Sequence, residues 1–241
     1  MELVFKKTDS IEVGFKNILV YGKSGTGKTF AAHTLNAKKT LVIASDVKGL
    51  KTLRPLGWIA DYLTVDKWDV LLEIYKELLK PEIQKKYDNI FVDDLTEINE
   101  KSKDWIVNVE RPKTKGIIDS KVYAELLTLQ DYMLLQNKIT KLLRAFRDLS
   151  FNIIFTCLED DVKDEQTGKI VHMPSMNGKM RLNMVGFFDE VFRLVVKEDG
   201  QRMFITDKTE RSLAKDRSGV LDKFEEPNFT DIFKKIDGGV K

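Results

Sequence analysis

The 241-residue sequence contains very little cysteine and histidine: one cysteine, Cys157, and two histidines, His33 and His172. A single cysteine excludes an internal disulfide framework and a cysteine-rich metal site, and two histidines argue against a histidine-based metal centre. No run approaches the roughly 18 apolar residues of a membrane-spanning helix, and the first residues, MELVFKKTDSIEVGF, lack an apolar signal core. We therefore expect a cytoplasmic chain that has no membrane partner.

The sequence also lacks a charge excess of either sign. Its 40 Lys and Arg residues nearly balance its 38 Asp and Glu residues, which leaves a net charge of +2. Any contact with nucleic acid must therefore come from a local basic patch. Internal repeats, low-complexity tracts and Pro/Ser-rich linkers are absent as well, so we expect one domain over residues 1–241.

Short apolar runs rich in β-branched and aromatic residues predict six strands. They cover residues 17–21, 40–45, 89–92, 152–157, 190–196 and 202–206. Helical patterns follow the early strands, at residues 28–35, 68–79 and 120–149. This alternation predicts an α/β fold with a mostly parallel central sheet flanked by helices. The Asp-Gly pair at Asp199 and Gly200 is a hairpin signal, which predicts antiparallel strands toward the C-terminal edge.

The segment GKSGTGKT fits the pattern G-x-x-x-x-G-K-[ST] at every fixed position, between a predicted strand and a predicted helix. In such a phosphate-binding loop (P-loop), backbone N–H groups surround phosphate oxygens and a lysine reaches the β- and γ-phosphates. A hydroxyl at the last position ligates Mg²⁺. We therefore assign Lys28 to the phosphates and Thr29 to Mg²⁺. The predicted nucleotide-binding residues are Gly22, Lys23, Ser24, Gly25, Thr26, Gly27, Lys28 and Thr29.

A P-loop needs a second apolar strand, ending in an acidic residue that supports the Mg²⁺ ion. The run NIFVDD at residues 89–94 meets this need, with Asp93 as the magnesium-side carboxylate. We expect this strand directly beside the P-loop strand. Hydrolysis also needs a carboxylate that orients the attacking water. Asp46, Asp94 and Glu97 are candidates, and residue patterns alone do not choose among them.

The segment DVKGLKTL, which begins at Asp46, resembles the one that follows the second strand in phage-type RecA-like ATPases. That group includes phage single-strand annealing and recombination proteins. The similarity continues in the strand that contains Thr156 and in residues 188–194 and 214–219, so it covers about residues 15–226. It implies a phage or prophage origin and a RecA-like P-loop NTPase core that uses ATP and Mg²⁺ as an oligomer on single-stranded DNA. Other recombination or replication proteins are further implied partners.

The same resemblance assigns catalytic roles to Asp46, Thr156, Lys215 and Arg217. Asp46 falls where RecA-like proteins carry the water-activating acidic residue, usually glutamate, so we prefer it to Asp94. Because aspartate is one methylene shorter, we expect slow turnover. The segment KDRSG is similar to the KNRFG of bacterial RadA. In such relatives the matching lysine and arginine reach the ATP site of a neighbouring subunit, and we carry that role over to Lys215 and Arg217.

RecA-like cores hold single-stranded DNA with two loops, here expected at residues 97–121 and 159–179. The first contains Trp105 and the basic stretch RPKTKG at 111–116, which suit base stacking and phosphate contact. The second begins with an acidic run, EDD, which would repel phosphate unless its basic residues face the strand instead. Two alternatives stay open: a P-loop small-molecule kinase and a nucleotide-dependent assembly switch with little hydrolysis. The kinase alternative lacks an arginine-rich lid, because Arg181 and Arg193 are isolated.

Overall fold

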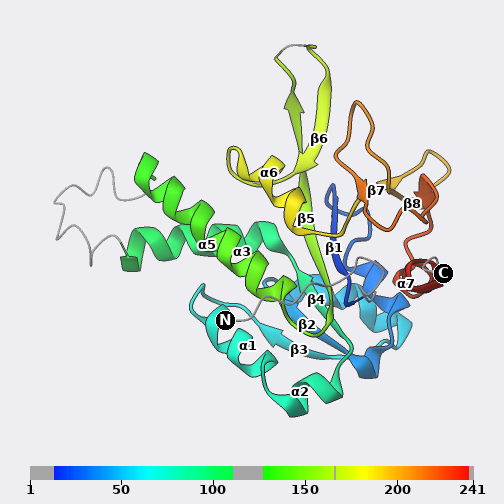
Figure 1. The fold of residues 1–241 in the computed structure, drawn as a ribbon, viewed down its shortest axis with the longest axis horizontal. Coiled ribbons are helices and arrows are strands. Elements are labelled where there is room, and N and C mark those ends of the chain that lie inside the picture. Colours follow the sequence, from blue (N-terminus) through cyan, green and yellow to red (C-terminus); the bar gives the residue numbers. More distant parts are fainter. Residues whose placement is uncertain (1–13, 111–126, 166, 239–241) are drawn as a thin grey trace, which may run out of the picture.

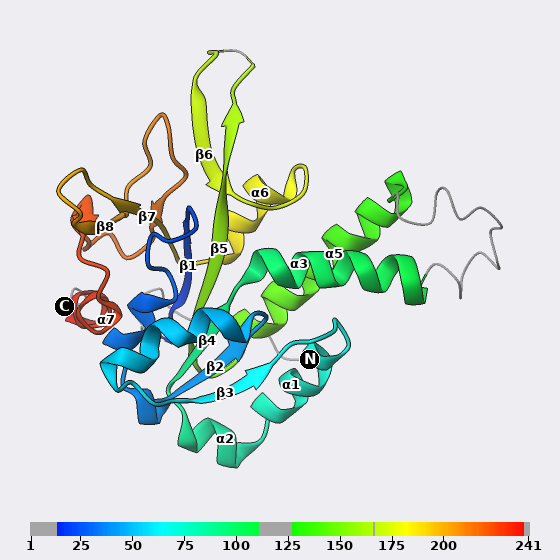
Figure 2. The same ribbon diagram turned by 180° about the vertical axis from the view of Figure 1, so that it is seen from behind.

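The computed structural model describes residues 14–110, 127–165 and 167–238, which form a mixed sheet covered by helices (Figures 1 and 2). Within these ranges the strand order is β10-β8-β7-β1-β5-β4-β2-β3, with β6 paired to β5 and β9 paired to β7. The strands are β1 (Asn17–Gly22), β2 (Thr40–Ala44), β3 (Asp61–Thr64), β4 (Asn89–Asp93), β5 (Asn152–Lys163), β6 (Ile170–Pro174), β7 (Glu190–Val196), β8 (Arg202–Ile205), β9 (Lys215–Asp216) and β10 (Phe224–Glu225).

The central strands β3, β2, β4, β5, β1 and β7 run parallel, whereas β6, β8, β9 and β10 pair antiparallel with their neighbours. The prediction of a mostly parallel sheet with antiparallel strands toward the C-terminal edge is therefore confirmed. This architecture agrees with a P-loop NTPase fold. One prediction about the order is wrong: the Asp93 strand β4 does not lie beside the P-loop strand β1, because β5 is inserted between them.

Helices pack on both faces of the sheet because the central strands are apolar on both sides. Leu19 and Tyr21 of β1 face one core, whereas Ile18 and Val20 face the other. The helices, including single turns and 3₁₀ or π segments marked η, are η2 (Phe30–Thr34), η3 (Ala37–Lys39), η4 (Val47–Leu56), α1 (Val70–Leu78), α2 (Pro81–Lys86), α3 (Leu95–Trp105), η5 (Ile106–Glu110), α5 (Leu129–Arg147), α6 (Met180–Asn183), η6 (Met184–Phe187) and α7 (Phe229–Gly238). Within the described ranges, no helix combines the length and apolar character needed to cross a membrane.

Four strands in the described part of the chain were not predicted, namely β3, β6, β9 and β10, and the last two have only two residues each. The edge strand β3 is exposed or half-buried along its length, and β6 lies outside the main strand order, where it pairs with the extension of β5. That extension, residues 158–163, is mostly charged and was not predicted as strand. Together β5 and β6 form a hairpin that projects beyond the sheet (Figure 1).

The helix predicted at residues 28–35 is a short 3₁₀ helix, η2, instead of an α-helix. Side chains occupy the carbonyl groups that an α-helix would use: Thr34 Oγ1 donates to Ala31 O at 2.8 Å, and His33 Nδ1 lies 2.6 Å from Phe30 O. Such local bonds compete with helical ones. Leu35 is then extended, so the helix stops after Thr34.

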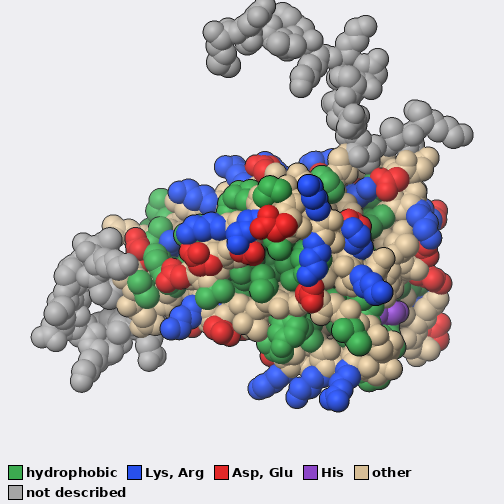
Figure 3. Space-filling model, turned by 90° about the horizontal axis from the view of Figure 1, so that it is seen from below, with side chains coloured by type: hydrophobic (Ala, Val, Ile, Leu, Met, Phe, Trp, Pro, Cys, Tyr) green, Lys and Arg blue, Asp and Glu red, His purple; other side chains and the backbone are tan. Residues whose placement is uncertain are grey.

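The long helical pattern at residues 120–149 corresponds to α5 where the structure describes it. Leu135, Ile139 and Leu143 are buried as predicted, but Leu129 and Tyr132 are exposed although they were placed on the apolar stripe. Helices α3 and α5 lie side by side and extend away from the sheet (Figures 1 and 2). The face in Figure 3 carries interspersed basic and acidic side chains, in keeping with the small net charge.

Candidate nucleotide-binding site

The P-loop opens onto a cavity of about 370 Å³ at the carboxyl ends of the parallel strands. Ligands of open α/β sheets bind at this edge. Besides the P-loop, the cavity is lined by Asp46 and Gly49, which follow β2, and by Asp93 and Asp94 at the end of β4. The structure thus brings together segments that lie about 70 residues apart in the sequence.

The P-loop backbone needs glycine for two reasons, its conformation and a close approach to another strand. Gly27 has φ of 102°, a left-handed conformation that side chains rarely adopt, and a β-carbon at Gly22 would lie 2.5 Å from Leu194 O. Inside the loop, Lys28 Nζ donates to Gly22 O at 2.7 Å and to Lys23 O at 3.0 Å. Burial lowers the pKa of Lys28, against the attraction of the nearby aspartates. The ammonium group therefore lies where incoming phosphates would meet it.

Asp93 is held by two hydroxyl groups that come from different elements. Thr29 Oγ1 donates to Asp93 Oδ2 at 2.7 Å, and Thr156 Oγ1 of β5 donates to Asp93 Oδ1 at 2.5 Å. Because β5 separates β4 from β1, Thr156 is the residue that fills the space between Asp93 and the P-loop strand. Only 7% of Asp93 is exposed, and burial raises the pKa of its carboxyl group.

The three candidates for orienting water occupy different positions. Asp46 is exposed at the start of η4 and lines the cavity, where its Oδ1 accepts a bond from Lys48 N. Asp94 lines the cavity too, but its Oδ1 caps α3 by accepting from Glu97 N at 2.7 Å, and burial raises its pKa. Glu97 is outside the cavity lining and pairs with Lys101. The geometry favours Asp46 and Asp94 over Glu97.

Gly49 and Arg202 also line the cavity, although neither was predicted as a site residue. A β-carbon at Gly49 would lie 3.5 Å from Asp93 Oδ2 and 3.7 Å from Thr29 Oγ1, so η4 packs directly against this pair. Its position within DVKGLKTL was a usable signal. Arg202 lies at the start of β8, far from the P-loop in the sequence, and no local pattern identifies it.

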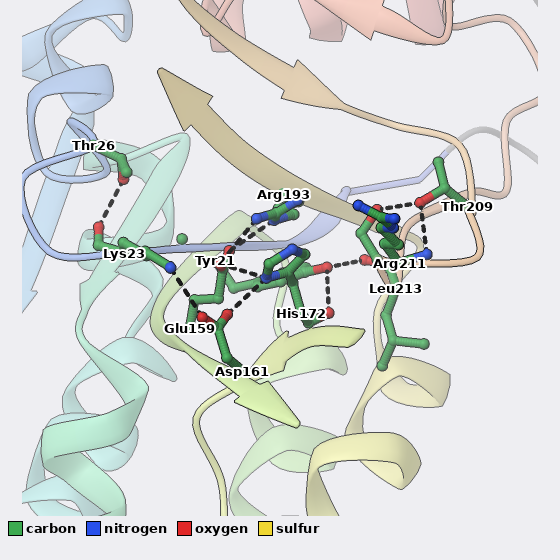
Figure 4. Close-up of polar contacts among 12 residues, drawn as sticks. Tyr21, Lys23, Thr26, Glu159, Asp161, His172, Arg193, Thr209, Arg211 and Leu213 are labelled. Atoms are coloured by element: carbon green, nitrogen blue, oxygen red, sulfur yellow. Dashed lines mark hydrogen bonds and ion pairs between the residues drawn. The ribbon is translucent and has the colours of Figure 1, made fainter. Parts of the chain in front are cut away.

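The side chain of Lys23 points away from the loop's interior and toward the β5–β6 hairpin (Figure 4). Its Nζ lies 3.0 Å from Asp161 Oδ2, while Arg193 binds Glu159 through Nε at 2.8 Å and Nη2 at 3.0 Å. His172 Nδ1 contacts both carboxylates. Because Arg193 and Lys23 already neutralise these carboxylates, we assign no metal ion to this group. Lys23 contributes to the P-loop through its backbone.

Lys215 and Arg217 lie away from the P-loop of their own chain. Lys215 of β9 lies opposite Val191 of β7, and Val191 in turn lies opposite Leu19 of β1. Leu19 is three residues before Gly22, where the P-loop begins. Three strand residues span about 10 Å. Lys215 Nζ donates to Phe188 O at 2.6 Å, and Arg217 Nη1 lies 2.5 Å from Asp189 Oδ1. Neither residue lines the cavity.

The two regions in which DNA-binding loops were expected are largely helix or strand where the structure describes them. Residues 97–105 belong to α3 and 106–110 to η5, while 111–121, with the basic stretch RPKTKG, lie outside the described residues. One face of the Trp105 ring is covered by Lys138, whose Nζ lies 3.8 Å from the ring centroid. The second region contains the β5–β6 hairpin, and Lys169 pairs there with Glu210.

The residues around the cavity fit a magnesium nucleotide. Thr29, Asp93, Asp46 and Asp94 supply oxygen ligands, which Mg²⁺ prefers, and the P-loop supplies backbone N–H groups and Lys28. A comparison with protein families agrees: a family model described as an AAA domain matches residues 15–218. The match spans the P-loop, the Asp93 strand and the segment that carries Lys215 and Arg217.

Proposed function

Because the chain belongs to this family of AAA-type P-loop ATPase domains, we propose that it binds and hydrolyses Mg²⁺-ATP. We further propose that it acts on single-stranded DNA in recombination or strand annealing. The observation that carries the nucleotide chemistry is the convergence of Lys28, the Thr29–Asp93 pair and Asp46 on one cavity. The DNA substrate rests on the resemblance to phage-type RecA-like ATPases.

Each residue has a distinct task in this proposal. Lys28 moves from the loop carbonyls to the β- and γ-phosphates and balances their charge. The Thr29 hydroxyl and the Asp93 carboxylate would hold Mg²⁺, and Thr156 fixes the orientation of that carboxylate. A Mg²⁺ ion held there would supply positive charge that offsets the negative charge of the phosphates. Asp46 accepts a hydrogen bond from the attacking water, for which its exposed position leaves access.

The active unit in this proposal is an oligomer. A P-loop provides positive charge from one side of the γ-phosphate, and a cation from elsewhere can raise the rate roughly 10³–10⁵-fold. Lys215 is about 10 Å from the level of its own P-loop along the strands, and Arg217 lies farther away, so we assign both to a neighbour's nucleotide. The Arg217 side chain is 57% exposed, which supports contact with a second subunit.

The test is phosphate release from ATP with and without a thymine-only single-stranded oligonucleotide, alongside particle sizing with a non-hydrolysable ATP analogue. We expect slow hydrolysis that single strands stimulate at least about tenfold, and a larger particle with the analogue. DNA affinity should fall steeply with salt, because it rests on phosphate charge. Phosphate transfer to a small acceptor would contradict the proposal in favour of a kinase. Assembly without sustained phosphate release would favour the assembly switch.

A further inference from the structure

A second cavity, of about 460 Å³, adjoins the first and shares Gly27, Phe30 and Arg202 with it. One wall is η2, which follows the P-loop. The other walls come from the turn before β8 and from residues 226–228, which precede α7. The two cavities therefore form one continuous path that begins at the phosphate loop and runs along η2.

Arg202 stands at the junction of the two cavities. Its Nε donates to Thr26 O at 3.0 Å, and its guanidinium lies 5.5 Å from the Phe30 ring centroid. A β-carbon at Gly27 would approach Arg202 Nε to 2.8 Å, so this glycine also makes room for the arginine. No carboxylate in the described part of the chain pairs with Arg202, and its Nη atoms have no hydrogen-bond partner there.

The Phe30 ring lies beneath this guanidinium and packs against His33. The rings of Phe30 and His33 have centroids 4.5 Å apart at an angle of 54°, and His33 Nδ1 contacts Phe30 O. Phe30 immediately follows Thr29, the last P-loop residue. A nucleotide whose phosphates bind the loop amides must therefore pass Phe30 as its ribose and base leave the loop.

We propose that the second cavity receives the nucleoside half of the nucleotide, with Arg202 and Phe30 contacting the base. This inference rests on the proposed function, since it assumes that the P-loop holds the phosphates. A guanidinium plane can stack on a flat base and donate hydrogen bonds at its edge. Arg202 is then a residue for affinity and base selection that acts within its own subunit, unlike Arg217.

Calorimetric titration of two ligands, ATP and inorganic tripolyphosphate, separates the base from the phosphates. We expect Arg202→Ala to weaken ATP about tenfold while the affinity for tripolyphosphate changes less than about twofold. Arg202→Lys keeps the charge but not the plane, and an intermediate loss for ATP is expected. Lys208→Ala removes an exposed cation that follows β8 and lines neither cavity, so it is the control, with no change for either ligand.

Equal losses for ATP and tripolyphosphate in Arg202→Ala would overturn the inference, because Arg202 would then support only the phosphate loop. Photolabelling with 8-azido-ATP gives a second measurement that needs no variant. Label that ATP competes away should fall on the tryptic peptides at residues 29–38, 198–202 and 224–234, which carry most of the residues that line this cavity. Label confined to other peptides would contradict a base in this cavity. Failure of the proposed function looks different: the unmodified protein would bind neither ligand.

Discussion

Glu190 gives the structure a pH dependence that can be worked out in advance. This residue begins β7, is 2% exposed, and accepts hydrogen bonds from Arg217 N at 3.1 Å and Ser218 N at 3.2 Å. Burial, with the adjacent Asp216 carboxylate, raises the pKa of Glu190 from 4.5 to about 7. The backbone N–H groups of Ser218 and Arg217 favour the charged carboxylate, but their effect on the pKa is smaller than that of burial.

Because the folded chain holds this proton more tightly than the unfolded chain, Glu190 contributes most stability below about pH 4.5. The contribution is lost as the pH rises through about 7. At 1.36 kcal/mol per pKa unit, the free energy of unfolding should fall by about 2.5 kcal/mol between about pH 5 and about pH 8. Glu190→Gln removes the titration and should abolish that fall.

Urea unfolding of the unmodified protein and of Glu190→Gln at both pH values measures the effect. The amide of glutamine faces a backbone N–H, but this cost is the same at both pH values and cancels in the comparison. Glu198→Gln, in the exposed turn between β7 and β8, is the control and should leave the pH dependence unchanged. The reasoning is refuted if Glu190→Gln changes the free energy of unfolding equally at both pH values.

Two further predictions concern the P-loop cavity. Lys28→Ala should weaken ATP binding at least about 100-fold, because charge-assisted hydrogen bonds to two phosphates are lost. Lys23→Ala should change the ATP affinity less than about threefold, because the Lys23 side chain pairs with Asp161 and not with the phosphates. Calorimetry compares the two, and similar affinities in both variants would count against the P-loop assignment. Asp46→Asn should retain ATP binding and stop phosphate release, since it deletes the charge that orients water. If only Asp94→Asn has that phenotype, Asp94 orients the water instead.

The parts of the fold that the sequence predicted are those with local signals. The buried strands β1, β2, β4 and β7 are rich in apolar residues. The P-loop is a contiguous motif in which backbone geometry requires glycine. Strand β3 and the outer half of β5 are exposed or half-buried, so their sequences are not the continuous apolar runs that mark buried strands.

Long-range placement could not be predicted in the same way. The position of β5 between β1 and β4 follows from the pairing of whole strands, and this placement makes Thr156 the partner of Asp93. Likewise, Arg202 reaches Gly27 only because β8 pairs with β7, next to β1. The 3₁₀ form of η2 depends on hydrogen bonds from the side chains of His33 and Thr34 to backbone carbonyls. Hydrophobic periodicity carries no information about such bonds.

Mixing two inactive variants tests the central claim, that ATP is hydrolysed at a P-loop site completed by a neighbouring subunit. Arg217→Ala keeps the P-loop cavity intact, and Asp46→Asn keeps the cation segment intact, so each alone should release little phosphate. In a mixed assembly, some interfaces join an intact Asp46 to an intact Arg217. The account predicts that an equal mixture regains roughly a quarter of the activity of the unmodified protein, the share expected if subunits mix at random and one such pairing suffices. No recovery in a mixture shown to co-assemble would contradict it, as would full activity in a dilute monomer.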